Sequence, residues 1–321
     1  MNVLVFGLGA VGTVFATFLK ESGNSVYAVV KEKYLNQLIN KPLKVDGIWG
    51  NHKAKLDGIV SDTKQLENIN FDFIILSVKS YDTKEAILSL KNLVRENTFL
   101  ILAQNGYGNY ETTKEIIPSQ NILLARVIFG AKLKEIGYAT VTVNADDVVI
   151  GQPENLADEN KVIKIVETIK NSNIPARYSP EVYQILWDKI LYNCALNPLG
   201  AILECSYGDL ANNEETRRLM NKIIIEIFKT AKLNKINLRW KTAREYINFF
   251  YEKLIPPTKN HYPSMYYDIK SGKKTEIDAL NGAIVNLAKK VKTNVPVNET
   301  ITRLIKFKET NTKTEEKWKI L

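Results

Sequence analysis

The feature that most constrains this chain is a glycine-rich turn near its start, placed between an apolar run and a helical pattern. Residues 3–6 are apolar, the turn follows directly, and a second strand-like run covers residues 25–31. In such a strand–turn–helix unit Gly7 permits the tight turn, Gly9 lets the backbone approach a pyrophosphate, and Gly12 allows the helix to pack closely on the strand. The helix N-terminus adds N–H groups that attract phosphate. The motif predicts a dinucleotide site at Gly7, Leu8, Gly9, Ala10, Val11 and Gly12; a turn without a ligand is the alternative.

The end of the second strand indicates which dinucleotide binds. A site for NAD usually has an acidic residue there, which binds the ribose 2′-hydroxyl. Here the residue is Lys31, followed by Glu32 and Lys33. A cation attracts the 2′-phosphate of NADP, whereas a carboxylate repels it. The sequence therefore favours NADP(H), with Lys31 as a cofactor-binding residue. NAD stays open if Glu32 turns inward.

The first half of the chain alternates strand-like and helix-like segments. Strands are expected at residues 2–7, 25–31, 71–78, 98–103, 122–129, 139–144 and 148–151, and helices near residues 11–21, 33–39, 83–94 and 110–117. Continuous apolar runs such as residues 73–76 are typical of parallel strands buried on both faces. Alternating strands and helices predict an α/β fold, with a Rossmann-like doubly wound sheet.

After about Pro180 the pattern becomes helical. Helices are expected at residues 182–196, 215–233, 242–254 and 276–291, separated by turn residues. A chain of 321 residues is long enough for two domains. We therefore expect a cofactor domain over residues 1–179 and an all-helical substrate and catalytic domain over residues 180–321, with the site between them.

Composition excludes several classes of protein. No run of 18 uninterrupted apolar residues is present, and the first apolar run lacks the features of a secretory signal, so neither a membrane span nor secretion is expected. The net charge of +9 comes from lysines spread along the chain rather than from a basic block, which does not favour nucleic acid binding. Cys194 and Cys205 form no metal-ligand or disulfide pattern, which is typical of a cytoplasmic protein.

Common proton donors of dehydrogenases are poorly represented. The chain has two histidines, His52 and His261, and His52 has no partnered acid nearby in the sequence. One Tyr-x-x-x-Lys pattern exists, from Tyr266 to Lys270, but it lies deep in the helical part, and the glycine turn has the wrong spacing for that class. Neither a histidine-based nor a tyrosine-based dehydrogenase is favoured.

A better candidate lies in the segment 187–198. Lys189, Asn193 and Asn197 recur every four residues and therefore share one face of a helix. Asparagine is a mediocre helix former, so two in line with a lysine suggest a polar cleft. A partly desolvated lysine has a lowered pKa, which suits proton transfer near neutrality. An exposed polar stripe would give the same spacing.

Two further polar clusters could complete such a site. Gln104-Asn105-Gly106 follows a predicted strand, at the sheet edge where ligands bind. Ser264-Met265 and Lys274-Thr275-Glu276-Ile277-Asp278 lie in the helical part. Glu276 also suits a helix start, because acids there are stabilised by the helix dipole.

Taken in order, these motifs resemble the ketopantoate reductase (2-dehydropantoate 2-reductase) family. The matching segments are residues 7–12, Ser77-Val78-Lys79, Gln104-Asn105-Gly106, residues 187–198, and Ser264-Met265 followed by Thr275-Glu276-Ile277-Asp278. The resemblance extends from Gly7 to Gly282. Each motif is moderately specific, and the set at these spacings is strong.

The resemblance implies that NADPH reduces the ketone of a 2-oxo acid, with Lys189 as the proton donor. Asn193, Asn197 and Ser264 would hold the substrate, and Asn105 would lie near both substrate and nicotinamide. The implied cofactor contacts also include Lys31 at the 2′-phosphate, Lys79, Ala131, and Glu276 near the nicotinamide ribose or Lys189.

Two departures affect the substrate. The family commonly has a substrate-binding asparagine at the positions of Tyr207 and His261. These side chains still form hydrogen bonds but change the pocket's shape, and buried polar groups discriminate strongly between substrates.

The leading hypothesis is ketopantoate reduction in pantothenate and coenzyme A synthesis. The alternatives are reduction of another small 2-oxo acid, and a non-catalytic NADP-binding sensor, against which Lys189 argues. The sequence does not fix the oligomeric state, although an apolar helical part is compatible with a homodimer.

Overall fold

The computed structural model describes residues 1–318, the last seven of them by their backbone alone. The chain forms two compact units. The first contains Met1–Gln104 and Asn109–Tyr183, and the second contains Asn105–Gly108 and the chain from Gln184 onward. The predicted boundary at residue 180, and the roles assigned to the two domains, stay predictions.

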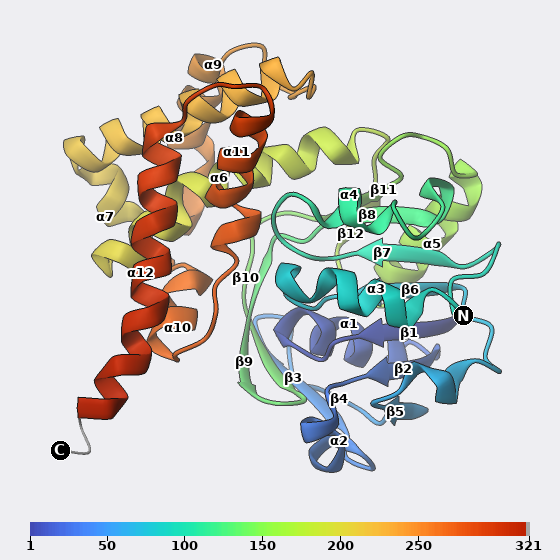
Figure 1. Ribbon diagram of the computed structural model, residues 1–321. Coiled ribbons are helices and arrows are strands. Elements are labelled where there is room, and N and C mark those ends of the chain that lie inside the picture. Colours follow the sequence, from blue (N-terminus) through green and yellow to red (C-terminus); the bar gives the residue numbers. More distant parts are fainter. Residues whose placement is uncertain (319–321) are drawn as a thin grey trace. The chain divides into compact units, whose positions relative to one another are not determined.

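The first unit is built on an eight-stranded sheet (Figure 1). Its strands, from one edge to the other, are β12 (Ala176–Tyr178), β11 (Val148–Gly151), β8 (Ile122–Arg126), β7 (Phe99–Leu102), β6 (Phe73–Leu76), β1 (Asn2–Phe6), β2 (Ser25–Val29) and β5 (Gly58–Val60). All neighbouring strands are parallel except β8 and β11. The predicted Rossmann-like α/β class is confirmed.

The central strands are buried on both faces. Every residue of β6 and β7 is buried, as expected for continuous apolar runs inside a parallel sheet. The helices of this unit are α1 (Ala10–Glu21), α2 (Glu32–Leu38), α3 (Thr83–Leu90), α4 (Asn109–Thr113) and α5 (Glu159–Asn171), with short 3-10 turns η1 (Thr63–Leu66), η2 (Ser80–Asp82) and η3 (Ser119–Asn121). Helix α1 contacts β1 and β2, so the glycine turn lies where strand and helix meet.

A second, four-stranded sheet was not predicted. Its order is β4 (His52–Ala54), β3 (Leu43–Gly47), β10 (Tyr138–Asn144) and β9 (Phe129–Glu135), and α1 contacts all four strands. The expected strand over residues 122–129 was wrong, because the chain there divides into β8 of one sheet and β9 of the other. Gly47 permits the close pairing of β3 with β10, since its φ is +107° and a Cβ there would lie 2.0 Å from the Val141 carbonyl oxygen.

The second unit is helical, as predicted. Its helices are α6 (Val182–Leu203, of which residues 184–203 belong to this unit), α7 (Tyr207–Asn212), α8 (Glu214–Leu233), α9 (Ala243–Phe249), α10 (Ser264–Lys270), α11 (Asn281–Lys290) and α12 (Pro296–Trp318), with the π-helical turn η4 (Phe250–Leu254) and 3-10 turns η5 (Pro256–Thr258) and η6 (Ile277–Ala279). Helix α8 contacts α7, α9, α11 and α12. Over residues 1–318, no helix combines the length and the apolar character that crossing a membrane requires.

Two expected helices have different limits. The helix that begins at Val182 was expected to end at Leu196, but it continues through Pro198 to Leu203. Pro198 has no N–H to donate to the carbonyl of Cys194, four residues earlier, and the Asn281 side chain donates to that oxygen instead, at 3.1 Å. The helix expected over residues 276–291 is divided into η6 and α11.

Candidate active site

The glycine turn has the geometry that a bound pyrophosphate needs. Gly7 has a φ of +98°, a conformation that favours glycine, and its N–H donates to the Val29 carbonyl at 2.9 Å. A Cβ on Gly12 would lie 2.0 Å from the Gly7 carbonyl oxygen, so only glycine fits there. A Cβ on Gly9, in contrast, would meet nothing within 4 Å. The backbone is therefore closely packed at Gly7 and Gly12, whereas the space next to Gly9 is open to a ligand.

The start of α1 suits an anion. Gly9 is its N-cap, no side chain caps it, and no acidic residue lies in its first turn. The first N–H groups of a helix have no partner within the helix, and the dipole favours negative charge there. Helix α8 differs, because Asn213 caps its first amides and two glutamates occupy its first turn. The residues of the turn thus fit a dinucleotide pyrophosphate.

The other predicted cofactor residues of this unit lie on several elements. Lys31 follows β2 and is the N-cap of α2, and Lys79 follows β6 and is the N-cap of η2. Strands β2 and β6 are the two neighbours of β1, so both lysines follow strands that flank the glycine turn. Ala131 lies on β9, in the second sheet, where it is partly buried.

The three residues predicted to share one helix face, Lys189, Asn193 and Asn197, all lie on α6. Asn193 and Asn197 are buried and Lys189 is partly buried, so this face is not an exposed polar stripe. The Lys189 ammonium Nζ donates to Asn105 Oδ1 at 2.6 Å. A lysine and an asparagine that are 84 residues apart in the chain are thereby brought together.

The segment that carries Asn105 is held by several contacts within the second unit. The Tyr107 N–H donates to the Ala279 carbonyl at 2.7 Å, and the Tyr107 and Trp187 rings lie 5.3 Å apart. A Cβ on Gly106 would lie 2.5 Å from the same Ala279 oxygen, which explains the glycine. Glu276 is buried and precedes η6, the turn that contains Ala279. Lys189, Asn105 and the η6 turn therefore belong to one local cluster.

The other predicted substrate residues lie on segments that follow α6, and two of them form a cluster with Asn197 of α6. The Tyr207 hydroxyl donates to Asn197 Oδ1 at 2.6 Å, and the rings of Tyr207 and His261 lie 5.2 Å apart. Burial raises the pKa of the Tyr207 phenol well above its ordinary value, so the hydroxyl stays a donor. Ser264 is exposed at the first position of α10, next to Pro263, which packs against Gly200 of α6.

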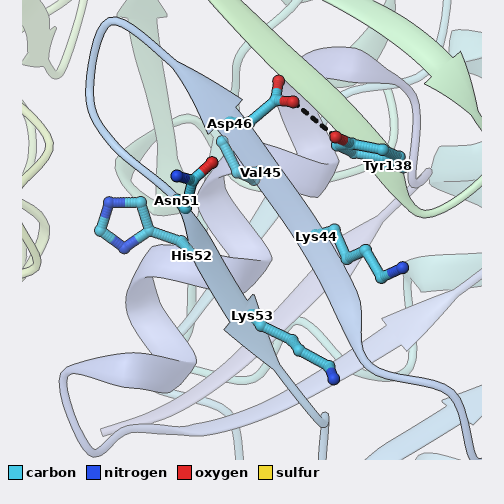
Figure 2. A pocket seen from close by; sticks show the side chains of 7 residues that line it. All are labelled: Lys44, Val45, Asp46, Asn51, His52, Lys53 and Tyr138. Carbon is cyan, nitrogen blue, oxygen red and sulfur yellow. Dashed lines mark hydrogen bonds between the residues drawn. The ribbon is translucent and has the colours of Figure 1, made fainter.

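A pocket in the first unit is lined by other residues (Figure 2). It is lined by Lys44, Val45, Asp46, Asn51, His52, Lys53 and Tyr138, on the second sheet. Asp46 Oδ2 accepts hydrogen bonds from Lys134 Nζ at 2.6 Å and from the Tyr138 hydroxyl at 2.5 Å. With Thr140, these donors lower the pKa of Asp46 to about 2. Its carboxylate is thus already paired, and the pocket contains none of the predicted site residues.

The sequence of this chain matches one family over most of its length. The family described as "Ketopantoate reductase PanE/ApbA" matches residues 3–155, and "Ketopantoate reductase PanE/ApbA C terminal" matches residues 181–309. A 2-dehydropantoate 2-reductase from Aquifex aeolicus (strain VF5) is 47% identical over 311 residues, which cover 96% of this chain and 97% of that protein. The chain belongs to the ketopantoate reductase family.

Solved structures share the fold. A D-mandelate dehydrogenase with NADH and anilino(oxo)acetate is 26% identical and superposes with a TM-score of 0.88, covering 98% of this chain and 99% of that one. A ketopantoate reductase from Ralstonia eutropha JMP134 is 24% identical, with a TM-score of 0.85 over 98% of this chain and 100% of that one.

The two residues named as departures in the sequence analysis, Tyr207 and His261, are neighbours. Tyr207 and His261 have their rings in contact, and the Tyr207 N–H donates to the His261 carbonyl at 3.1 Å. Burial lowers the pKa of His261, so its imidazole is neutral at neutral pH. Two aromatic rings thus lie together at these positions, and the Tyr207 hydroxyl is hydrogen-bonded to Asn197.

Two contacts near the cofactor turn were not predicted, one by Ser77 of the Ser77-Val78-Lys79 segment and one by Asp82. The Ser77 hydroxyl donates to the Gly7 carbonyl at 2.7 Å and would meet a Cβ on Gly12. The Asp82 carboxylate accepts a hydrogen bond from Lys31. Both follow β6, the strand beside β1, and a search for polar residues just after that strand would have found them.

Proposed function

We propose that this chain reduces ketopantoate to pantoate with NADPH, a step in pantothenate and coenzyme A synthesis. The observation that carries the proposal is the hydrogen bond from Lys189 to Asn105 on a largely buried polar face, in a chain of this family. Two asparagines follow Lys189 along the same face, which gives the polar groups that a 2-oxo acid needs.

Reduction of the ketone requires one hydride at the carbonyl carbon and one proton at its oxygen. Bound NADPH supplies the hydride. As hydride arrives, negative charge develops on the carbonyl oxygen. The Lys189 ammonium stabilises this charge and then donates its proton to the oxygen. Asn105 fixes the direction of the ammonium by accepting one of its hydrogens. The products are a secondary alcohol, oxidised NADP+ and a neutral lysine amine, which takes up a proton from water before the next turnover.

The other site residues bind and orient. Asn193, Asn197 and Ser264 hold the substrate, with Tyr207 and His261 beside Asn197. Glu276 lies near the nicotinamide ribose or Lys189. The residues of the glycine turn, with Lys31, Lys79, Asn105 and Ala131, hold the cofactor, and the turn places helix N–H groups at the pyrophosphate.

A second candidate is reduction of a different 2-oxo acid on the same scaffold. The aromatic pair Tyr207 and His261 favours it, because bulky rings change the shape and polarity of the substrate pocket. The similar structure solved with anilino(oxo)acetate is that of a D-mandelate dehydrogenase, not of a ketopantoate reductase.

Steady-state oxidation of NADPH separates these functions. Ketopantoate is compared with pyruvate, 2-oxoisovalerate and phenylglyoxylate, and we expect the highest kcat/KM with ketopantoate. Turnover of another acid alone would support the second candidate and contradict the first. Absence of turnover with every acid, together with retained NADPH binding, would instead indicate a sensor.

We also expect the protein to work in the cytoplasm as a homodimer. Both cysteines are free thiols, as a reducing compartment would leave them. On α12, Leu304 and Phe307 are exposed apolar side chains of the kind found at interfaces. Light scattering should give twice the mass of one chain, and the mass of a single chain would contradict the dimer.

A further inference from the structure

Lys31, the residue expected to bind the 2′-phosphate, is already engaged in an ion pair. Its Nζ lies 2.9 Å from Oδ2 of Asp82, 51 residues later in the chain. Asp82 ends η2, the turn after β6, whereas Lys31 follows β2. Because β2 and β6 flank β1, this ion pair joins the two segments on either side of the glycine turn.

The ion pair is accessible to a ligand. The Lys31 side chain is 64% exposed and that of Asp82 is 27% exposed. The hydrogen bond to Asp82 raises the pKa of Lys31, and Glu85, in the first turn of α3, adds a further negative charge that acts in the same direction. A phosphate that binds Lys31 must therefore approach a carboxylate as well.

The Asp82 carboxylate is not needed to cap a helix. Asp82 is the N-cap of α3, but its side chain makes no capping hydrogen bond. Its backbone N–H donates to the Lys79 carbonyl at 2.9 Å, a contact that does not depend on the side chain. The carboxylate thus contributes to the ion pair rather than to the start of α3.

We propose that Asp82 sets the preference of this protein between NADPH and NADH, an inference that rests on the proposed dinucleotide site. Its carboxylate weakens binding of the 2′-phosphate of NADPH, and it accepts a hydrogen bond from the ribose 2′-hydroxyl of NADH. Asp82 therefore narrows the preference for NADPH over NADH, and loss of its charge makes the protein more selective for NADPH.

The physical basis is a balance of charges at one spot. A 2′-phosphate dianion is attracted by Lys31, but Asp82 cancels much of that attraction at short range. A ribose hydroxyl carries no charge and finds in Asp82 the acidic acceptor that NAD sites usually place at the end of the second strand. Because both side chains are partly exposed, salt should screen the repulsion.

Binding of cofactor fragments tests this without any turnover. Calorimetry measures 2′,5′-ADP, which carries the 2′-phosphate, and 5′-AMP, which carries the hydroxyl, on the wild type and on Asp82→Asn. We expect the substitution to tighten 2′,5′-ADP about tenfold at low ionic strength, equal to about 1.4 kcal/mol. Binding of 5′-AMP should become no tighter, and at 0.5 M salt most of the gain for 2′,5′-ADP should disappear.

Two other variants serve as controls for net charge and for the choice of substitution at Asp82. Glu154→Gln removes a carboxylate from the Lys114–Glu154 ion pair of the same unit, so it changes the net charge equally and should leave both affinities unchanged. Asp82→Ser removes the same negative charge with a shorter side chain and should give the same affinities as Asp82→Asn. Thermal unfolding checks that each variant is folded.

Several results would overturn the proposal. If Asp82→Asn binds 2′,5′-ADP as weakly as the wild type or more weakly, the carboxylate orients Lys31 instead of opposing the phosphate. An equal gain in affinity for 2′,5′-ADP in Glu154→Gln would show that the effect comes from net charge alone. Failure of the wild type to bind either fragment would overturn both this proposal and the cofactor assignment, whereas loss of ketopantoate turnover alone would affect only the proposed function.

Discussion

At the scale of single residues, Tyr207 is the side chain most directly tied to substrate choice. Its buried hydroxyl donates to Asn197 Oδ1, and in Tyr207→Phe that oxygen loses its partner. An unpaired buried polar atom costs about 1–3 kcal/mol. We expect KM for the 2-oxo acid to rise about tenfold, because Asn197 is no longer held in place, while the Kd for NADPH stays unchanged.

Tyr192 offers a matched control for this prediction. Its ring packs edge-on against Tyr207, and its hydroxyl is hydrogen-bonded to Thr258 at 2.6 Å instead of to a predicted site residue. Tyr192→Phe therefore removes a hydroxyl from the neighbouring ring and should leave KM for the 2-oxo acid unchanged. Equal effects of the two substitutions would mean that Tyr207 matters only for packing.

The glycine turn allows binding and folding to be separated. Gly9 has open space at its Cβ position and a φ of −70°, so Gly9→Ala should fold with a melting temperature close to that of the wild type. The added methyl group occupies the space of the pyrophosphate, and we expect NADPH binding to weaken at least tenfold. Calorimetry measures the binding and differential scanning calorimetry the stability.

Gly12→Ala should behave in the opposite way. Its Cβ would lie 2.0 Å from the Gly7 carbonyl oxygen, so the strand–helix contact must open and the melting temperature must fall. A Gly9→Ala variant that binds NADPH normally would exclude the pyrophosphate from this turn.

At the scale of elements, α6 depends on a substitute hydrogen bond. Pro198 leaves the Cys194 carbonyl without a helical donor, and Asn281 of α11 supplies one. We expect Asn281→Leu to lower the free energy of unfolding by about 2 kcal/mol. In a Pro198→Ala background the cost should be less than half, because the alanine introduced there has a backbone N–H that donates to the carbonyl.

Urea denaturation of the four proteins in this cycle measures the coupling between the two positions. The bond from Asn281 to Asn298 is lost in both backgrounds, so the difference between them isolates the Cys194 carbonyl. Identical costs of Asn281→Leu in both backgrounds would show that Asn281 does not compensate for the proline.

Elements that rest on local patterns could be predicted from the sequence. The apolar runs of β6 and β7 and the glycine turn identified the parallel sheet, because burial on both faces leaves a local signature. The second sheet left none: β3 and β10 pair over more than 90 residues, through contacts such as Gly47 against Val141. The continuation of α6 through Pro198 could not be predicted either, because the hydrogen bond that replaces the missing one comes from Asn281 of α11.

The candidate site shows the same division. Helical spacing placed Lys189, Asn193 and Asn197 on one face, and the structure keeps them on one helix. The bonds from Lys189 to Asn105 and from Lys31 to Asp82 join residues 84 and 51 positions apart, which no local pattern specifies. Residue types in the site could thus be predicted, but not their pairing.

At the scale of the whole molecule, the two histidines respond to pH in opposite directions. Burial of His52 opposes its protonation, but the Trp49 carbonyl and the Glu21 carboxylate outweigh burial and raise its pKa above 6.5. Protonated His52 therefore stabilises the fold below pH 6.5, and this contribution is lost as the pH rises through the folded pKa.

His261 has the reverse effect. Burial lowers its pKa, so below pH 6.5 the unfolded chain takes up a proton more readily than the folded one, and stability falls with the pH until the folded pKa is passed. We expect His52→Gln to be more destabilising at pH 5.5 than at pH 7.5, and His261→Gln to be less so. Melting temperatures at both pH values check this, and the same pH trend in both variants would contradict it.

We propose that Lys189 protonates the ketone of ketopantoate during reduction by NADPH. The most direct test of this role is kcat for NADPH oxidation by the wild type and Lys189→Ala at saturating ketopantoate, with the Kd for NADPH measured on both proteins. We predict that the wild type turns over, that Lys189→Ala loses more than about a hundredfold in kcat, and that the Kd for NADPH barely changes. A wild type that does not oxidise NADPH with ketopantoate, or a variant whose kcat stays within about tenfold, would contradict the claim.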